Sequence, residues 1–280
     1  MLNVAQIKNI ISENNLCINK RLGQNFLIDK IKRDKIIQAC DIKKDDAILE
    51  IGPGLGALTE FLISLCKKLV GVEKDRGLNS LLKQQLSESE NLELIQGDIL
   101  KFDLKPLYKK YRKKIKVIGN LPYYITSPII FHLIDQKECI DSIFITLQKE
   151  VAERIVAAPG GKDYGVLSLS VQYHCKPKIL FSIPKSAFFP MPKVGSAFLE
   201  LKIRKEPAVK VKDEALLFNI VKSGFSQRRK TLINALSARS SLKISKEKLK
   251  EVFDKAGLDP NIRGEALNLE DFARLTQFLT

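Results

Sequence analysis

The sequence is poor in the residues that bind metals and form disulfides. It has no tryptophan, two histidines and five cysteines. The cysteine count is odd, no two cysteines form a Cys-x-x-Cys pair, and only His132 and His174 could complete a zinc ligand set. This pattern argues against a disulfide framework and predicts reduced, buried thiols and no metal site. The cysteines are Cys17, Cys40, Cys66, Cys139 and Cys175.

Long apolar runs are also missing. A membrane-spanning helix needs roughly 18 or more consecutive apolar residues, and the sequence has no such run. The first 15 residues favour an amphipathic helix over a signal peptide, because no cleavage site follows them. We therefore expect a soluble, cytoplasmic protein.

Acidic residues are too few to balance the basic ones. Asp and Glu number 32 against 47 Lys and Arg, which leaves a net charge of +15. A surplus of this size favours a polyanionic partner such as nucleic acid, through counterion release and electrostatic steering. The alternative is a basic surplus that serves only solubility.

Between residues 46 and 203, short apolar runs alternate with helical patterns, which is typical of a parallel sheet with helices on both faces. A loop of 12 residues separates the last two runs and is too short for a helical crossover, so we expect those strands to be antiparallel. This predicts an α/β fold with a mostly parallel sheet and an antiparallel last strand pair. The expected strands are 47–51, 69–73, 92–96, 116–119, 142–148, 178–183 and 196–203.

Residues 204–280 have helical patterns and no expected strand, which predicts a small all-helical domain after a first domain of residues 1–203. The helical part holds 16 basic and 10 acidic residues, a surplus of +6, which leaves +9 for the first domain. Since both parts are basic, we expect a bound nucleic acid to contact both. The expected helices are 213–223, 228–238, 245–256 and 269–279.

A glycine-rich loop follows the first expected strand. Gly52, Gly54 and Gly56 occupy alternate positions before a helix, where glycine permits a tight turn and a close approach of ligand to backbone N–H groups. Dinucleotide enzymes use a similar loop, but their third glycine falls one residue later, at the position of Ala57. The spacing therefore favours another adenosine-containing ligand.

Acidic residues follow the next two strands. Glu73 lies 21 residues after Gly52, where a carboxylate can accept hydrogen bonds from both ribose hydroxyls. Asp98, after the third strand, is placed to contact an adenine ring. Either carboxylate alone could be a solvated strand-end charge, but together with the glycine loop they predict one shared site.

The most specific segment is Asn120-Leu-Pro-Tyr-Tyr124, after the fourth strand. The Asn120 side-chain carbonyl and a backbone carbonyl of the rigid loop, at Leu121, offer two acceptors that can orient an exocyclic amine. Tyr123 offers a flat apolar face for an extruded base. The alternative is a proline turn with two packed tyrosines.

On these residues the chain resembles the ribosomal RNA adenine dimethyltransferase family, and the resemblance covers nearly the whole length. The resemblance implies a Rossmann-like class I methyltransferase domain followed by the small helical domain. It also implies that S-adenosylmethionine donates four methyl groups to the exocyclic amines of two adjacent adenosines. These lie in the 3′-terminal hairpin of 16S ribosomal RNA, so it also implies a role in 30S subunit biogenesis. The matching segments are Leu22–Asp29, Glu50–Thr59, Val72–Asp75, Gly97–Asp98, Asn120–Pro128, Gln148–Arg154, Phe188–Val194 and Phe225–Thr231.

The resemblance also assigns roles to residues. It implies a base held between Tyr123 and Phe188, with residues 22–27 folded over the cofactor as a lid. From the residues alone, the lid could be a polar turn and Phe188 a core aromatic. Phe189 and Met191 depart from the family pattern at the pocket rim. The implied cofactor residues are Asn25, Leu27, Gly52, Gly54, Glu73, Asp98 and Asn120.

A basic run near the C-terminus comprises Arg228, Arg229 and Lys230, with Lys222 on the same segment. We expect these side chains to contact RNA phosphates, although a solvated helix face is the usual alternative for such a run. We expect the protein to act as a monomer on its RNA substrate.

Two rival functions are enzymatic and one is not. A methyltransferase of large-subunit ribosomal RNA would share the cofactor loop, but typically carries Ile at the position of Leu121 and lacks the Ser127-Pro128 pair. A nicotinamide-dependent oxidoreductase conflicts with the glycine spacing. A non-enzymatic RNA-binding assembly factor would not need the cofactor and amine sites.

Overall fold

The computed structural model describes residues 2–19, 22–227, 229–238 and 244–279. The chain forms two compact units, the first of residues 1–152 and 178–203 and the second of residues 153–177 and 204–280. None of the helices in the described ranges has the length and apolar character that a bilayer crossing requires.

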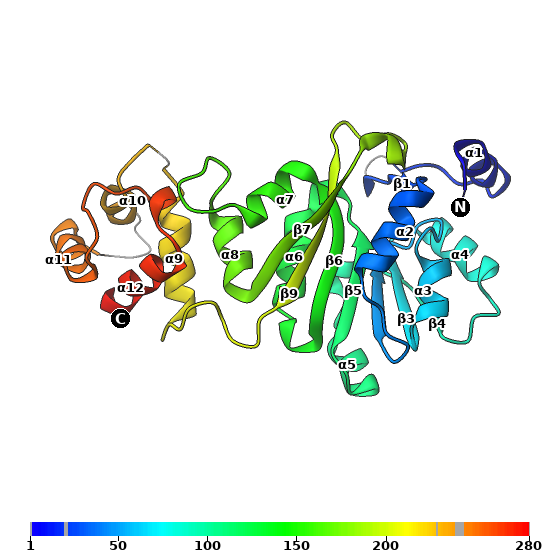
Figure 1. The fold of residues 1–280 in the computed structure, drawn as a ribbon, viewed down its shortest axis with the longest axis horizontal. Helices are drawn as coiled ribbons and strands as arrows, with labels where there is room; N and C mark the ends of the chain where they lie inside the picture. Colours follow the sequence, from blue (N-terminus) through cyan, green and yellow to red (C-terminus); the bar gives the residue numbers. More distant parts are fainter. Residues whose placement is uncertain (1, 20–21, 228, 239–243, 280) are drawn as a thin grey trace. The chain divides into compact units, whose positions relative to one another are not determined.

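A seven-stranded sheet forms the centre of the first unit (Figure 1), with the strand order β4-β3-β2-β5-β6-β9-β7. β2, β3, β4, β5 and β6 are parallel, and β9 is antiparallel to β6. The expected strands are therefore confirmed, some with longer ends. Their bounds are β2 Ala47–Ile51, β3 Lys68–Glu73, β4 Leu92–Gln96, β5 Ile115–Asn120, β6 Ile140–Gln148, β7 Cys175–Ile183 and β9 Ser196–Ile203.

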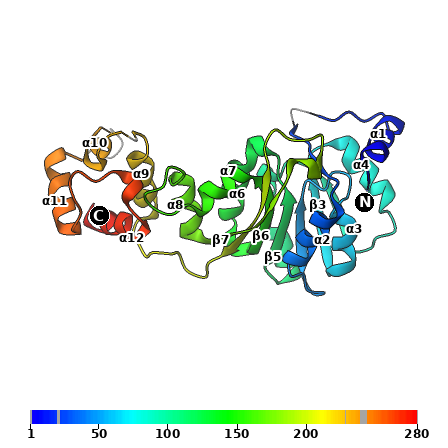
Figure 2. The ribbon, with the colours of Figure 1, turned by 45° about the horizontal axis from the view of Figure 1, so that its top comes forward.

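Every residue of β2 is buried, as expected for a central strand with helices on both faces. Helices α2 and α3 lie against one face of the sheet (Figure 2), where Ile36 and Leu62 pack with Ile48 and Ile118 of the strands. The helices of this unit are α1 Val4–Glu13, α2 Lys30–Ala39, α3 Thr59–Leu65, α4 Arg76–Gln85, α5 Lys105–Tyr111 and α6 Thr126–Ile134, and α7 Lys149–Val156 leads into the second unit.

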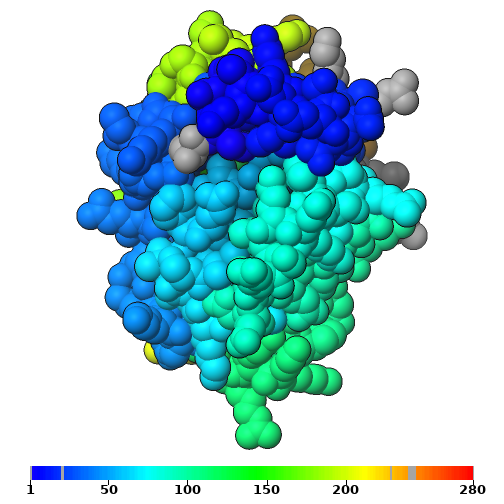
Figure 3. Space-filling model, turned by 90° about the vertical axis from the view of Figure 1, so that its right-hand side faces the viewer, coloured from blue at the N-terminus to red at the C-terminus, as the bar shows by residue number. Residues whose placement is uncertain are grey.

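The N-terminal helix packs on the first unit through a small apolar cluster. Ile7 of α1 is buried with Leu78 and Leu81 of α4 and with Phe26. In Figure 3 the dark blue N-terminal segment lies across the top of this side of the molecule. Asn3 caps α1, because its side chain accepts a hydrogen bond from the backbone N–H of Gln6. The sequence pattern had predicted this amphipathic helix.

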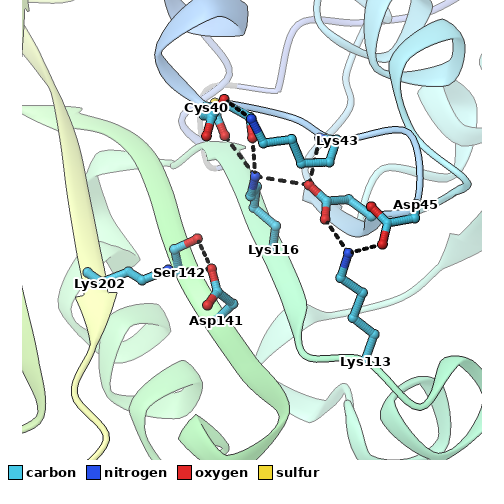
Figure 4. Close-up of polar contacts among 10 residues, drawn as sticks. Cys40, Lys43, Asp45, Lys113, Lys116, Asp141, Ser142 and Lys202 are labelled. Carbon is cyan, nitrogen blue, oxygen red and sulfur yellow. Dashed lines mark hydrogen bonds and ion pairs between the residues drawn. The ribbon is translucent and has the colours of Figure 1, made fainter.

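Lysines join the amino ends of two central strands (Figure 4). The ammonium of Lys116 on β5 donates to the backbone carbonyls of Cys40 and Asp41 at 2.9 and 2.7 Å, and to the Asp46 carboxylate at 3.0 Å. Lys113 contacts the same carboxylate at 3.0 Å. These bonds lie at the edge of the sheet opposite the carboxyl ends of the strands, so they stabilise the fold away from any ligand there.

The second unit is helical and has its own core. Tyr164 and Leu169 pack with Leu217 and Phe272, and the Tyr164 hydroxyl donates to the Leu267 carbonyl at 3.0 Å. Residues 153–177 therefore belong with the C-terminal helices, whereas the sequence had placed them in the first domain. The helices are α8 Val166–His174, α9 Glu214–Gly224, α10 Leu232–Ser237, α11 Lys246–Ala256 and α12 Leu269–Leu279.

Candidate active site

A single cavity in the first unit brings together all the residues that the sequence predicted for the cofactor and for catalysis. It opens at the carboxyl ends of β2, β3, β4 and β5, where ligands bind in open α/β sheets. These lining residues are Asn25, Leu27, Gly52, Gly54, Glu73, Asp98, Asn120, Leu121, Tyr123 and Phe188.

The glycine loop after β2 is shaped to approach a ligand. Gly52 and Gly54 have φ angles of +64° and +61°, in the left-handed region that side chains other than glycine disfavour. A Cβ on Gly52 would meet nothing within 4 Å, so this part of the backbone faces open space. The loop can therefore receive a ligand at van der Waals distance.

The Glu73 carboxylate anchors this loop. It is 7% exposed, and its two oxygens accept hydrogen bonds from the backbone N–H groups of Gly54 at 3.0 Å and Asp75 at 2.8 Å. Burial raises the pKa of Glu73, and the two N–H bonds oppose that shift by stabilising the ionised form. Each oxygen can accept a further bond, so a diol could be bound here without displacing the loop.

Asp98 has partners that the sequence did not reveal. One oxygen accepts a hydrogen bond from the Leu100 N–H at 3.0 Å, and the other lies 2.8 Å from the Lys74 ammonium. The hydrogen bond from Lys74 is the largest cause that lowers the pKa of Asp98, so this carboxylate is ionised at neutral pH. No sequence signal singled out Lys74, which also lines the cavity.

The Asn120 side chain is held in one orientation. Its amide nitrogen donates to the backbone carbonyl of Asn25 at 2.8 Å, and the Asn25 amide in turn donates to the Gly23 carbonyl at 2.9 Å. Because the nitrogen is bound to the segment around Asn25, the side-chain oxygen of Asn120 is the group that can accept a bond from an amine.

A 3₁₀ turn over Tyr123–Ile125 follows Asn120. The Leu121 N–H donates to the Thr146 carbonyl at 3.0 Å, and the Thr126 hydroxyl donates to the Pro122 carbonyl at 3.2 Å. These bonds fix the turn at both ends. Tyr123 is half-buried in the cavity wall, so it is not the packed core tyrosine of the alternative interpretation.

Residues 22–27 also line the cavity. The Gln24 amide donates to the Asp75 carboxylate at 3.0 Å. The short strand β1, Phe26–Leu27, pairs with β8, Phe188–Phe189, and Leu27 is the partner of Phe188. Phe188 is 2% exposed and packs in the sheet core, and it also lines the cavity. Phe188 is therefore a core residue, as the residues alone allowed, and its role in holding a base stays a prediction that its place in the cavity wall permits.

The basic residues expected to bind RNA belong to the second unit. Lys222 is exposed on α9, and Arg229 and Lys230 are exposed in the turn before α10. Arg228 lies outside the described residues. The sequence had extended the helix back to residue 228, but Thr231 caps α10 by accepting from the Asn234 N–H, so the helix begins at Leu232.

The described parts of the chain contain no group of three or more His, Cys, Asp or Glu side chains that could hold a metal ion. All five cysteines are free thiols, and only Cys17 is exposed. Burial raises the pKa of Cys40 to about 12, which keeps this thiol protonated.

The family model for ribosomal RNA adenine dimethylase matches residues 15–280. Ribosomal RNA small subunit methyltransferase A of Alkaliphilus metalliredigens is 46% identical over 275 residues, which cover 98% of this chain and 96% of that protein. The protein of the same name from Lachnoclostridium phytofermentans is 44% identical over 273 residues, 96% of this chain and 94% of that protein.

Solved structures agree with the sequence comparison. A dimethyladenosine transferase from Plasmodium falciparum superposes with a TM-score of 0.78 at 29% identity and covers 89% of this chain and 95% of its own. The 23S rRNA methyltransferase ErmE, at 24% identity, has a TM-score of 0.70 over 91% of this chain and 99% of its own, and it supports the fold alone.

The sheet order, the glycine loop and the strand-end carboxylates define a class I methyltransferase fold. The family match over residues 15–280 makes the assignment more specific. The chain belongs to the ribosomal RNA adenine dimethylase family.

Proposed function

We propose that this protein dimethylates the exocyclic amines of two adjacent adenosines in the 3′-terminal hairpin of 16S ribosomal RNA, with S-adenosylmethionine as methyl donor. The observation that carries the proposal is the placement of Asn120 and Tyr123 in the same cavity as Gly52 and Glu73. The relatives named ribosomal RNA small subunit methyltransferase A support the choice of RNA.

The residues present fit an adenosine-containing donor. Glu73 would accept bonds from the ribose hydroxyls, and the backbone at Gly52, with open space before it, would lie against the donor. Asp98, Asn25 and Leu27 would complete the binding site, and Gly54 holds the Glu73 carboxylate in place. S-adenosylmethionine supplies a methyl group that its sulfonium already activates.

The protein's contribution to the reaction is to orient the adenine amine. Its N–H groups donate hydrogen bonds to the side-chain oxygen of Asn120 and to the backbone carbonyl of Leu121. These two bonds hold the nitrogen lone pair out of conjugation with the ring. Tyr123 and Phe188 hold the base. The proton leaves after attack, because the methylated amine is strongly acidic at that point and can release it to water.

We further propose that the second unit binds ribosomal RNA through Lys222, Arg228, Arg229 and Lys230. The exposure of the three described side chains supports this role, as does the basic surplus of residues 204–280. The protein would act as a monomer in the bacterial cytoplasm and take part in assembly of the small subunit.

The test compares wild type with Asn120→Ala in transfer of labelled methyl groups to small subunits that lack adenine dimethylation. We expect transfer to fall by about 100-fold or more, since an acceptor that acts in the transition state is lost. Subunit affinity should stay within about twofold, because the target amine is the one group of the RNA that Asn120 is proposed to contact. Equal losses of transfer and affinity would contradict the assigned role, and binding without transfer by wild type would favour an assembly factor.

A further inference from the structure

Ser196 is a buried hydroxyl whose partner belongs to the proposed base-binding site. It is the first residue of β9 and is 0% exposed. Its hydroxyl lies 2.6 Å from the hydroxyl of Tyr123, the ring that lines the cavity beside Asn120. Nothing in the sequence pattern connects these two residues, which are 73 positions apart.

We propose that Ser196 is a positioning residue that holds the Tyr123 ring at the distance and angle at which the adenine is presented for methyl transfer. The proposal rests on the proposed function, because it assigns a task within the same site. It also gives the Tyr123 hydroxyl a role, whereas the sequence suggested a role for the ring face only.

The ring needs a second point of attachment. Rotation about the Cα–Cβ bond swings the far end of a tyrosine ring between rotamers, and a hydrogen bond to the hydroxyl selects one of them. The backbone of the turn is already fixed, because the Thr126 hydroxyl donates to the carbonyls of Pro122 and Tyr123 at 3.2 and 3.4 Å. With the hydroxyl bound to Ser196, the ring is held at both ends.

Ser196 is a rigid anchor for this purpose. It pairs in register with Gln148 of β6, and β9 lies between β6 and β7 in the sheet. In the chain, β9 follows β8, which carries Phe188, the other aromatic residue proposed to hold the base. The bond from Ser196 therefore ties the Tyr123 side chain to a strand inside the sheet.

The bond persists at the pH at which the protein works. Burial is the largest cause that raises the pKa of Tyr123, so the phenol keeps its proton at neutral pH. The hydrogen bond between the two neutral hydroxyls is lost if either hydroxyl is removed, and the remaining one is left without this partner.

A double-mutant cycle tests the proposal with Tyr123→Phe, Ser196→Ala and the double variant. Each single change deletes one hydroxyl and creates no clash. We expect each single variant to lower the kcat of methyl transfer by about tenfold, the worth of one buried hydrogen bond. The double variant should equal either single one, because the bond can be lost only once. The KM for S-adenosylmethionine should not change, since Glu73 and Gly54 are untouched.

Ser142→Ala is the matched control. Ser142 is a buried serine at the other end of β6, 2% exposed, whose hydroxyl lies 3.0 Å from the Asp141 carboxylate (Figure 4). It should leave kcat at the wild-type value. Wild-type kcat in Ser196→Ala would overturn the proposal, and so would a double variant whose loss is the product of the two single losses. If kcat and the fraction of protein that binds S-adenosylmethionine fall by the same factor, Ser196 has a structural role only, and this too would overturn the proposal.

A second readout separates this proposal from the proposed function. RNA with 2-aminopurine at the target adenosine reports stacking of the base on Tyr123 by quenching, without methyl transfer. We expect Ser196→Ala to reduce the quenching and Ser142→Ala to leave it unchanged. If wild type transfers no methyl group but the quenching depends on Ser196, only the proposed function fails. Equal quenching in wild type and Ser196→Ala would overturn the positioning role.

Discussion

Glu73→Gln is a nearly isosteric change that should separate cofactor affinity from stability. In the wild type, both carboxylate oxygens accept backbone N–H bonds, from Gly54 and Asp75. A glutamine keeps one oxygen and places an NH₂ group against the other N–H, which loses its acceptor. Leaving a buried N–H unpaired costs about 1–3 kcal/mol.

The change in stability should still be small. Burial raises the pKa of Glu73, which means that the folded protein bears a cost for this charge, and glutamine removes that cost. The relief opposes the penalty of the unpaired N–H, so we expect the free energy of unfolding to change by about 1 kcal/mol or less.

Affinity for S-adenosylmethionine should fall much further. The variant loses the charge that strengthens two bonds from ribose hydroxyls, and charge-assisted bonds are worth about 1.5–3 kcal/mol each. A loss of only 2 kcal/mol in total weakens binding by about 30-fold. Isothermal titration calorimetry with S-adenosylmethionine measures the affinity, and thermal unfolding measures the stability.

Glu60→Gln serves as the control, because Glu60 is an exposed carboxylate in the first turn of α3 that lines the same cavity but has no assigned contact with the ribose. It should keep wild-type affinity. A folded Glu73→Gln protein that binds S-adenosylmethionine as tightly as wild type would refute the assignment of Glu73 to the ribose.

Three further predictions concern the pH dependence of stability, the salt dependence of RNA binding and the contribution of Lys116 to stability. Burial raises the pKa of Glu50 from 4.5 to about 8, so its contribution to stability is full below pH 4.5 and is lost as the pH rises through 8. In the cofactor-free protein, Glu50→Gln should make the unfolding midpoint depend less on pH over that range. A variant with the pH profile of the wild type would contradict this. Replacing Arg229 and Lys230 together by Gln should reduce the slope of log affinity for RNA against log salt by about 2. Lys250→Gln, an exposed change on α11, is the control, and an unchanged slope in the double variant would exclude phosphate contacts. Lys116→Met should cost about 2–3 kcal/mol of stability, because Asp46 and two carbonyls lose a donor, with methyl transfer by the folded protein intact. A wild-type unfolding midpoint would refute that estimate.

The sequence predicted the sheet well because each strand carries its own signal. Apolar runs between helical patterns located β2 and β4 at their observed bounds. Gly52, Glu73 and Asn120 could be predicted as one site, since the carboxyl ends of parallel strands meet at one edge of a sheet.

Contacts between distant segments could not be predicted in this way. Tyr164 and Leu169 lie in a segment that the sequence placed in the first domain, but they pack with the C-terminal helices, because an apolar pattern does not show which core a segment joins. The bonds of Lys74 to Asp98 and of Ser196 to Tyr123 likewise depend on how the strands are arranged in space.

The most direct measurement is the position and number of methyl groups that the purified protein adds to the RNA of small subunits lacking adenine dimethylation. The RNA would be digested after reaction with S-adenosylmethionine and its fragments analysed by mass spectrometry. We predict two dimethyladenosines at adjacent positions in the 3′-terminal hairpin of 16S ribosomal RNA, four methyl groups in all. Methylation at any other adenosine, or monomethylation as the final product, would contradict the proposed function.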